Sequence, residues 1–96
     1  MVKHSVIFTF KQGVDKNSQQ SFLDASAKLS GIPGVKNLEV LKQTSSKNNY
    51  DYGILMEFDN NETYQSYNNH PQHQQFIEQF WLKYVDQFME IDFEAL

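Results

Sequence analysis

The sequence predicts one α+β domain whose elements follow the order β-α-β-β-α-β. Its 96 residues are enough for a single domain but not for two, so the domain spans residues 1–96. Segments with the every-second-residue alternation of strands are interrupted by segments with the periodicity of amphipathic helices. The Pro-Gly pair at 33–34 and the polar run at 59–61 mark two of the boundaries between them.

The first strand is expected over residues 4–10, where β-branched and aromatic residues dominate. One face of this strand carries His4, Val6, Phe8 and Phe10. The other face carries Ser5, Ile7 and Thr9. Because apolar side chains occur on both faces, the strand is predicted to be partly buried on each of them.

A helix is expected next, over residues 16–30, with either Asp15 or Asn17 as its N-cap. Its apolar stripe consists of Phe22, Leu23, Ala25, Ala27 and Leu29. Proline and glycine interrupt regular structure, so the segment 32–35 is expected to end this helix.

Two further strands are expected over residues 36–43 and 50–58, separated by a polar loop at 44–49. The alternation is loose in the first of them, where Leu38 and Val40 are the main apolar members. It is clear in the second, which places Tyr52, Ile54, Met56 and Phe58 on one face.

A second helical region is expected to start near Glu62 and to consist of two pieces. The residue before a proline is biased away from helical angles, so the first piece should break at His70. Pro71 can open the next piece as its first residue. In this second piece, one continuous face carries His73, Phe76, Ile77 and Phe80.

A last strand is expected over residues 88–93.

This order of elements is the ferredoxin-like arrangement, a four-stranded antiparallel sheet with both helices on one face. The opposite face of the sheet is then open, although Ile7 and Leu55 point apolar side chains to it. Apolar sheet faces of this kind usually find a partner. We therefore expect a homodimer in which two sheets stack through their open faces.

The composition of the chain excludes several classes of function. With eight lysines, no arginine and twelve acidic residues, the formal net charge is -4, so no nucleic-acid partner is expected. The absence of cysteine leaves no disulfide, thiolate zinc site or cysteine nucleophile. No apolar run approaches the length of a membrane span and no export signal is visible. We therefore expect no membrane partner and a cytoplasmic location.

Among the three histidines, His73 is the main candidate for chemistry. It is expected in the first turn of a helix, on the apolar face. Burial at a helix N-terminus disfavours an imidazolium, and a neutral imidazole is a competent general base near pH 7. The alternative interpretation is a core histidine that bonds a backbone carbonyl.

Tyr67, His4 and His70 are weaker candidates, and each has a structural alternative. The Tyr67 hydroxyl could polarise a substrate carbonyl beside His73, or its ring could simply be buried with the hydroxyl in water. His4 lies on the face assigned to the helices and is either a pocket residue or a satisfied core residue. For His70 we favour a role in ending or capping a helix.

No metal site is expected. His70 and His73 are three residues apart across a proline, which is not the spacing of a helical zinc pair, and no carboxylate stands beside them. Asp92 and Glu94 in the last strand are interpreted as solvated charges that protect the sheet edge.

The sequence resembles the stress-responsive A/B barrel (Dabb) domain family over residues 2–95. The most specific part of the resemblance is the block from Tyr67 to His73, in which Tyr67, His70, Pro71 and His73 match the family pattern. The strand histidine His4, the Ile-Pro-Gly-Val segment at 32–35 and the final Ile91-Asp92-Phe93 add to it.

The resemblance implies a dimeric α+β barrel of ferredoxin-like subunits. In one plant polyketide cyclase of this family a histidine is the general base and a tyrosine assists an intramolecular aldol condensation. Matching the motif assigns these roles to His73 and Tyr67, with no cofactor. The expected pocket lining is His4, Val6, Phe8, Phe22, Leu23, Ile54, Met56 and Phe76.

Three functions follow from these observations as alternatives. The first is a homodimer that binds a small apolar or carbonyl-bearing compound, with or without cyclase-like catalysis. The second is a non-catalytic stress or assembly protein whose dimer is the functional unit. The third, the least favoured, is a monooxygenase of the related dimeric barrel superfamily, since a shared fold does not set function.

Overall fold

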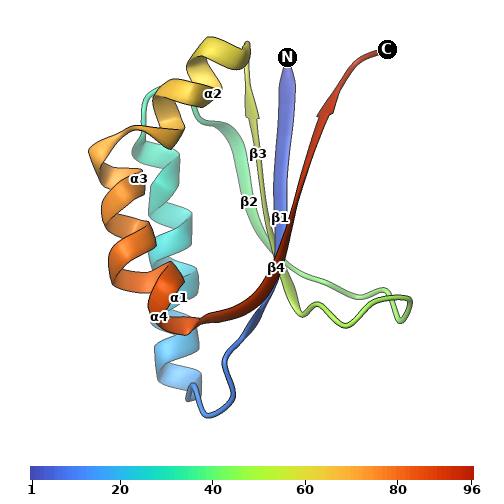
Figure 1. The fold of residues 1–96 in the computed structure, drawn as a ribbon, viewed down its shortest axis with the longest axis vertical. Helices are drawn as coiled ribbons and strands as arrows, with labels where there is room; N and C mark the ends of the chain where they lie inside the picture. The colour runs from blue at the N-terminus through green and yellow to red at the C-terminus, as the bar shows by residue number, and fades with distance from the viewer.

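The computed structural model describes residues 1–96 and shows one antiparallel sheet covered by helices on one face (Figure 1). The sheet has the strand order β2-β3-β1-β4. This architecture confirms the predicted ferredoxin-like α+β fold. Its strands are β1 (Val2–Phe10), β2 (Lys36–Lys42), β3 (Tyr52–Phe58) and β4 (Val85–Glu94).

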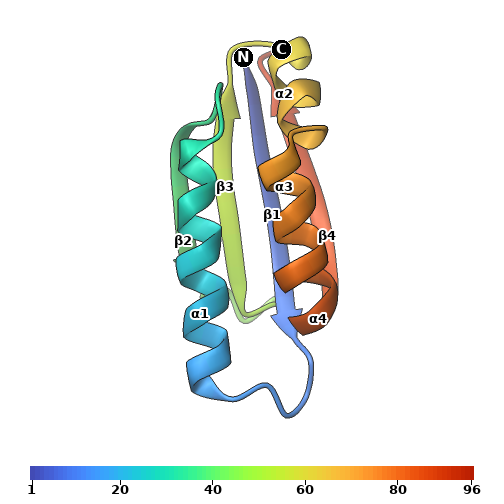
Figure 2. The same cartoon turned by 90° about the vertical axis from the view of Figure 1, so that its left-hand side faces the viewer.

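The helical layer consists of two columns. The first is α1 (Lys16–Ala27), which continues as a short 3₁₀ turn over Lys28–Gly31. The second column contains α2 (Asn61–Asn68), α3 (Pro71–Phe76), a π-helical segment over Ile77–Trp81 and α4 (Leu82–Tyr84). Figure 2 shows α1 in front of β2, and α3 in front of β1 and β4.

Side-chain caps determine where the helices begin. Asp15, not Asn17, caps α1, because its carboxylate accepts a hydrogen bond from the Ser18 N–H at 2.7 Å. Asn60 caps α2 in the same way through the Thr63 N–H at 2.8 Å. The predicted break at His70 is confirmed, and Pro71 is the first residue of α3.

Several element boundaries differ from the predictions. The helix predicted over 16–30 changes to 3₁₀ geometry after Ala27, and Ala27 itself is exposed. β3 begins two residues later than predicted, at Tyr52. β4 is longer than the predicted 88–93, because Val85 already pairs with Phe10 of β1 beyond a register shift. The π-helical segment was not predicted.

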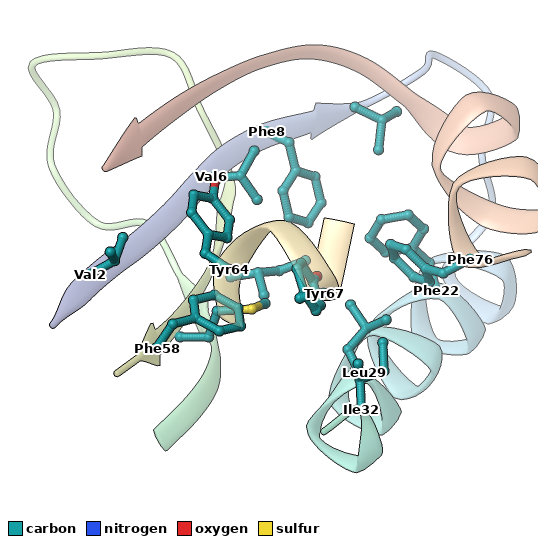
Figure 3. Close-up of a cluster of buried hydrophobic side chains, with 13 residues drawn as sticks. Val2, Val6, Phe8, Phe22, Leu29, Ile32, Phe58, Tyr64, Tyr67 and Phe76 are labelled. Carbon is teal, nitrogen blue, oxygen red and sulfur yellow. The ribbon is translucent and has the colours of Figure 1, made fainter. Parts of the chain in front are cut away.

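The core lies between the sheet and the helices (Figure 3) and is rich in aromatic rings. Phe8, Phe22 and Phe58 are completely buried. The Phe8 and Phe22 rings pack with their centroids 5.3 Å apart, which joins β1 to α1. Ser26 is completely buried beside them, and its hydroxyl donates to the Phe22 carbonyl at 2.9 Å.

The outer face of the sheet carries exposed apolar side chains. In the register of the sheet Ile7 pairs with Met89, and Ser5 pairs with both Leu55 and Ile91. Met89 is 48% exposed and Phe93 is 58% exposed, because no helix covers this side. No helix of the chain is both long and apolar enough to cross a membrane.

Candidate functional site

A cavity of about 290 Å³ lies between the inner face of the sheet and the second helical column. Its wall is mostly apolar, and its polar groups come from two histidines, one tyrosine and one glutamate. The residues that line it are His4, Val6, Leu29, Ile54, Met56, Tyr67, His73, Phe76, Ile77, Trp81, Leu82, Phe88 and Glu90.

The sheet supplies its lining residues by alternation. His4 and Val6 of β1 share a face with Ile54 and Met56 of β3, because the register pairs His4 with Met56 and Val6 with Ile54. The same rule brings Glu90 of β4 opposite Val6. Three neighbouring strands therefore form one continuous wall of the cavity.

The kinked second column supplies the opposite wall. Tyr67 is on α2 and His73 is on α3, and the break at Pro71 brings their rings to a centroid distance of 4.4 Å. Ile77 and Trp81 lie at the two ends of the π-helical segment and both line the cavity. Such wide helical turns occur frequently at functional sites.

His73 is a neutral imidazole with one nitrogen free. Its Nδ1 lies 3.0 Å from the Asn68 carbonyl oxygen, and an oxygen of this kind only accepts, so Nδ1 carries the hydrogen. Nε2 is then left with its lone pair. Burial lowers the pKa of His73 below its ordinary value, which the hydrogen bond to Asn68 only partly offsets. The ring can accept a proton near neutral pH.

Tyr67 is a buried donor beside that base. The side chain is only 3% exposed, and no hydrogen bond joins its hydroxyl to another residue of the chain. Burial, helped by the charge of Glu90, raises the pKa of Tyr67 well above its ordinary value. The hydroxyl therefore keeps its proton at physiological pH and can donate it in a hydrogen bond to a bound oxygen.

His4 belongs to a second polar group, which we name the His4 cluster and which contains His4, Asp92 and Tyr64. The Nδ1 atom of His4 lies 2.6 Å from Asp92 Oδ1, and the Tyr64 hydroxyl donates to Asp92 Oδ2 at 3.0 Å. The Tyr64 oxygen is also 2.9 Å from His4 Nδ1. Because a carboxylate only accepts, Nδ1 of His4 carries a hydrogen in this contact.

The interpretation of Asp92 as a solvated edge charge holds only in part, because Asp92 is exposed on the edge strand β4 but also contacts a buried histidine. Asp92 pairs with His4 in the β1–β4 register, so its side chain lies on the helix side of the sheet and contacts a histidine that is 7% exposed. Glu94, two residues later, is exposed and has one long contact of 3.5 Å from the Asn61 amide. The alternation of β4 places Glu90 and Asp92 on one face of the strand, and the register with β1 shows that this is the face of His4.

The structure brings five of the eight expected lining residues to the cavity and leaves Phe8, Phe22 and Leu23 outside it. Phe8 and Phe22 fill the core next to it, where the Trp81 ring covers both of them. Leu23 packs against the same core. Sequence reasoning missed six lining residues, which come from the 3₁₀ turn after α1, the π-helical segment, α4 and β4, namely Leu29, Ile77, Trp81, Leu82, Phe88 and Glu90.

His70 is not part of the cavity. Its Nδ1 accepts a hydrogen bond from the Gln72 N–H at 3.1 Å, so it is the N-cap of α3, as the capping interpretation suggested. The chain contains no group of three histidine or acidic side chains placed to hold a metal ion.

Comparison with protein families identifies the domain. The model of the stress responsive A/B barrel domain (Dabb) family matches residues 2–95. The chain belongs to the Dabb family. No curated protein matches its sequence.

Solved structures agree with the assignment of this Dabb domain. A Dabb family protein with a ferredoxin-like fold from Mesorhizobium loti is 40% identical, with a TM-score of 0.92 over 99% of this chain and 96% of that chain. A dimeric ferredoxin-like protein from Thermobifida fusca is 20% identical, with a TM-score of 0.84 and coverages of 98% and 90%. The hydroxynitrile lyase of Passiflora edulis has the same fold at 12% identity, with a TM-score of 0.86 and coverages of 96% and 90%.

Proposed function

We propose that this Dabb domain binds a small apolar compound by its carbonyl group in the cavity, with His73 as general base and Tyr67 as hydrogen-bond donor. The observation that carries this proposal is the pair of facing rings, one a neutral imidazole with a free nitrogen and the other a buried phenol with a free hydroxyl. An apolar wall around two such groups is typical of a small-molecule site.

The reaction that this arrangement supports is proton abstraction next to a carbonyl, without a cofactor. Tyr67 donates a hydrogen bond to the carbonyl oxygen while His73 Nε2 takes the proton from the adjacent carbon. The C–H bond breaks and its electron pair moves into an enolate on the carbonyl oxygen. In a cyclisation the enolate carbon forms a bond to a second carbonyl carbon, the first C=O bond re-forms, and the new alkoxide oxygen takes the proton from the His73 imidazolium. In an isomerisation the imidazolium returns the proton to a different carbon that is conjugated with the enolate.

The His4 cluster supports the same chemistry from the sheet side. His4 lines the cavity, and its bond to Asp92 orients the ring. Asp92 and Tyr64 are positioning residues for His4. A hydroxynitrile lyase on the same fold supports the idea that the fold can hold an enzyme active site, although fold alone does not assign a reaction.

A thermal-shift screen tests this function. We expect a stabilising compound among small aromatic and aliphatic aldehydes and ketones, with the stabilisation lost in His73→Ala. His70→Asn is the matched control, because it changes a histidine three residues away that lies outside the cavity, and asparagine can still cap α3. If no carbonyl compound stabilises the wild type, or if His73→Ala responds like the wild type, the proposal is wrong.

We also propose that the functional unit is a homodimer joined through the outer sheet faces. The exposed apolar side chains of β4 support it, and several proteins of the same fold are described as dimeric. The same surface favours the second candidate function, a non-catalytic stress or assembly protein in which the dimer alone matters. That candidate gains if the protein is dimeric and the compound screen finds nothing.

A further inference from the structure

Glu90 is the one charged side chain in an otherwise uncharged cavity wall. The other lining residues are apolar, aromatic or histidine, and no lysine reaches the cavity. No cationic side chain lies beside the Glu90 carboxylate, since the carboxylates that have a basic side chain within 4 Å are Asp92, next to the His4 ring, and Asp59, next to Lys36. It is exposed on its solvent side, so its carboxylate stands at the mouth of the cavity without a partner.

The charge of Glu90 extends to the groups that would handle the compound. After burial, it is the next cause that raises the pKa of Tyr67, and it opposes the lowering of the His73 pKa. A carboxylate at this position therefore acts on a compound bound beside these two rings. It repels a second negative charge in the cavity.

Aromatic side chains surround the mouth next to Glu90. Phe88 precedes Glu90 by two residues on the same face of β4 and is 52% exposed. Its ring contacts the Trp81 ring edge-on at a centroid distance of 5.4 Å. A carboxylate and aromatic rings that line the same cavity form an environment that attracts an ammonium group.

From this arrangement we infer that the compound bound in the cavity carries a hydrogen-bond donor, best a protonated amine, that meets Glu90 at the mouth, and that carboxylate and phosphate compounds are excluded. The inference rests on the proposed function, because it adds a second anchor to a compound whose carbonyl group lies at Tyr67 and His73. Glu90 would then determine the selectivity of the cavity for ligands of different charge.

Calorimetric titration with three matched acetophenones tests the inference. They carry at the 4-position a dimethylaminomethyl group, which is protonated at neutral pH, a methyl group, or a carboxylate. With the wild type at low salt we expect the amine to bind roughly fivefold more tightly than the methyl compound, and the carboxylate roughly fivefold more weakly. In Glu90→Gln both differences should shrink to less than about twofold.

Glu94→Gln is the matched control, since it removes the same charge from the same strand but from a residue outside the cavity. It should keep the order of the three affinities. The inference is overturned if the carboxylate binds the wild type as well as the methyl compound does, or if Glu90→Gln keeps the wild-type order. If the methyl compound binds the wild type but not His73→Ala, and the three compounds bind the wild type equally well, the proposed function stands and only this inference fails. When none of the three binds, both fail.

Discussion

At the scale of single residues, the site depends on the proton states that burial imposes. His73 and Tyr67 line the same cavity. Burial lowers the pKa of His73 and raises the pKa of Tyr67, so it favours the neutral form of each side chain. The base is therefore unprotonated and the donor is protonated over the same range of pH. The apolar surroundings alone therefore favour the unprotonated imidazole and the protonated phenol, and no neighbouring cation is needed.

The stability of the domain should depend on pH through His73. Its pKa is lower in the folded chain than in the unfolded chain, so the unfolded chain binds more protons as the pH falls below 6.5, the ordinary value. The free energy of unfolding should therefore fall on acidification. Urea unfolding measures this at pH 7.5 and pH 5.5, values on either side of about 6.5. The free energy of unfolding should fall less between these two values in His73→Gln than in the wild type.

The difference between the two proteins isolates His73, because the other titrating groups are common to both. His70→Asn provides the comparison for loss of a histidine outside the cavity. An equal fall in wild type and His73→Gln would show that burial does not perturb His73.

At the scale of elements, β4 supplies two lining residues of the cavity, Phe88 and Glu90, and is the hardest strand to interpret from the sequence. Its inner face presents Phe88, Glu90 and Asp92 to the helices, and its outer face presents Met89 and Ile91. Both faces contain apolar residues, so hydrophobic alternation could not choose between them. The pairing with β1 decides the question.

Replacing Asp92 by alanine should destabilise the domain by about 1–2 kcal/mol, because the buried ring of His4 and the hydroxyl of Tyr64 both lose their carboxylate acceptor. Glu94→Ala, on the same face of β4, should change the free energy of unfolding by less than about 0.5 kcal/mol. Chemical denaturation of both variants measures the difference. Similar values for the two would show that Asp92 is only a surface charge.

Much of the fold could be predicted because local signals and tertiary structure agree in it. Asp15 and Asn60 stand where caps are needed, and Pro71 stands where a helix is interrupted. Tyr67 and His73 could be singled out for the same reason. The His4–Asp92 contact could not be predicted, since it joins residues 88 positions apart. The π-helical turn could not be predicted either, because it has no simple periodicity in the sequence.

At the scale of the whole molecule, the uncovered face of the sheet predicts self-association. We expect sedimentation at micromolar concentration to give twice the monomer mass of 11.3 kDa. Ile91→Lys places a charge on that face, in the edge strand β4, and should weaken the dimer at least about tenfold. Asp24→Lys, on the exposed side of α1, should leave the dimer intact. A wild-type protein that sediments as a monomer would contradict the proposed interface.

The pairing of the first strand with the last also has a consequence for the order of synthesis. During synthesis β1 leaves the ribosome before β4, so His4 has no contact with Asp92 until the last strand has emerged. The part of the cavity wall that Phe88 and Glu90 form is also missing until then. A nascent chain therefore has no finished binding site, however much of its helical layer has formed. Capture of a compound would report that translation and folding of the whole domain are complete.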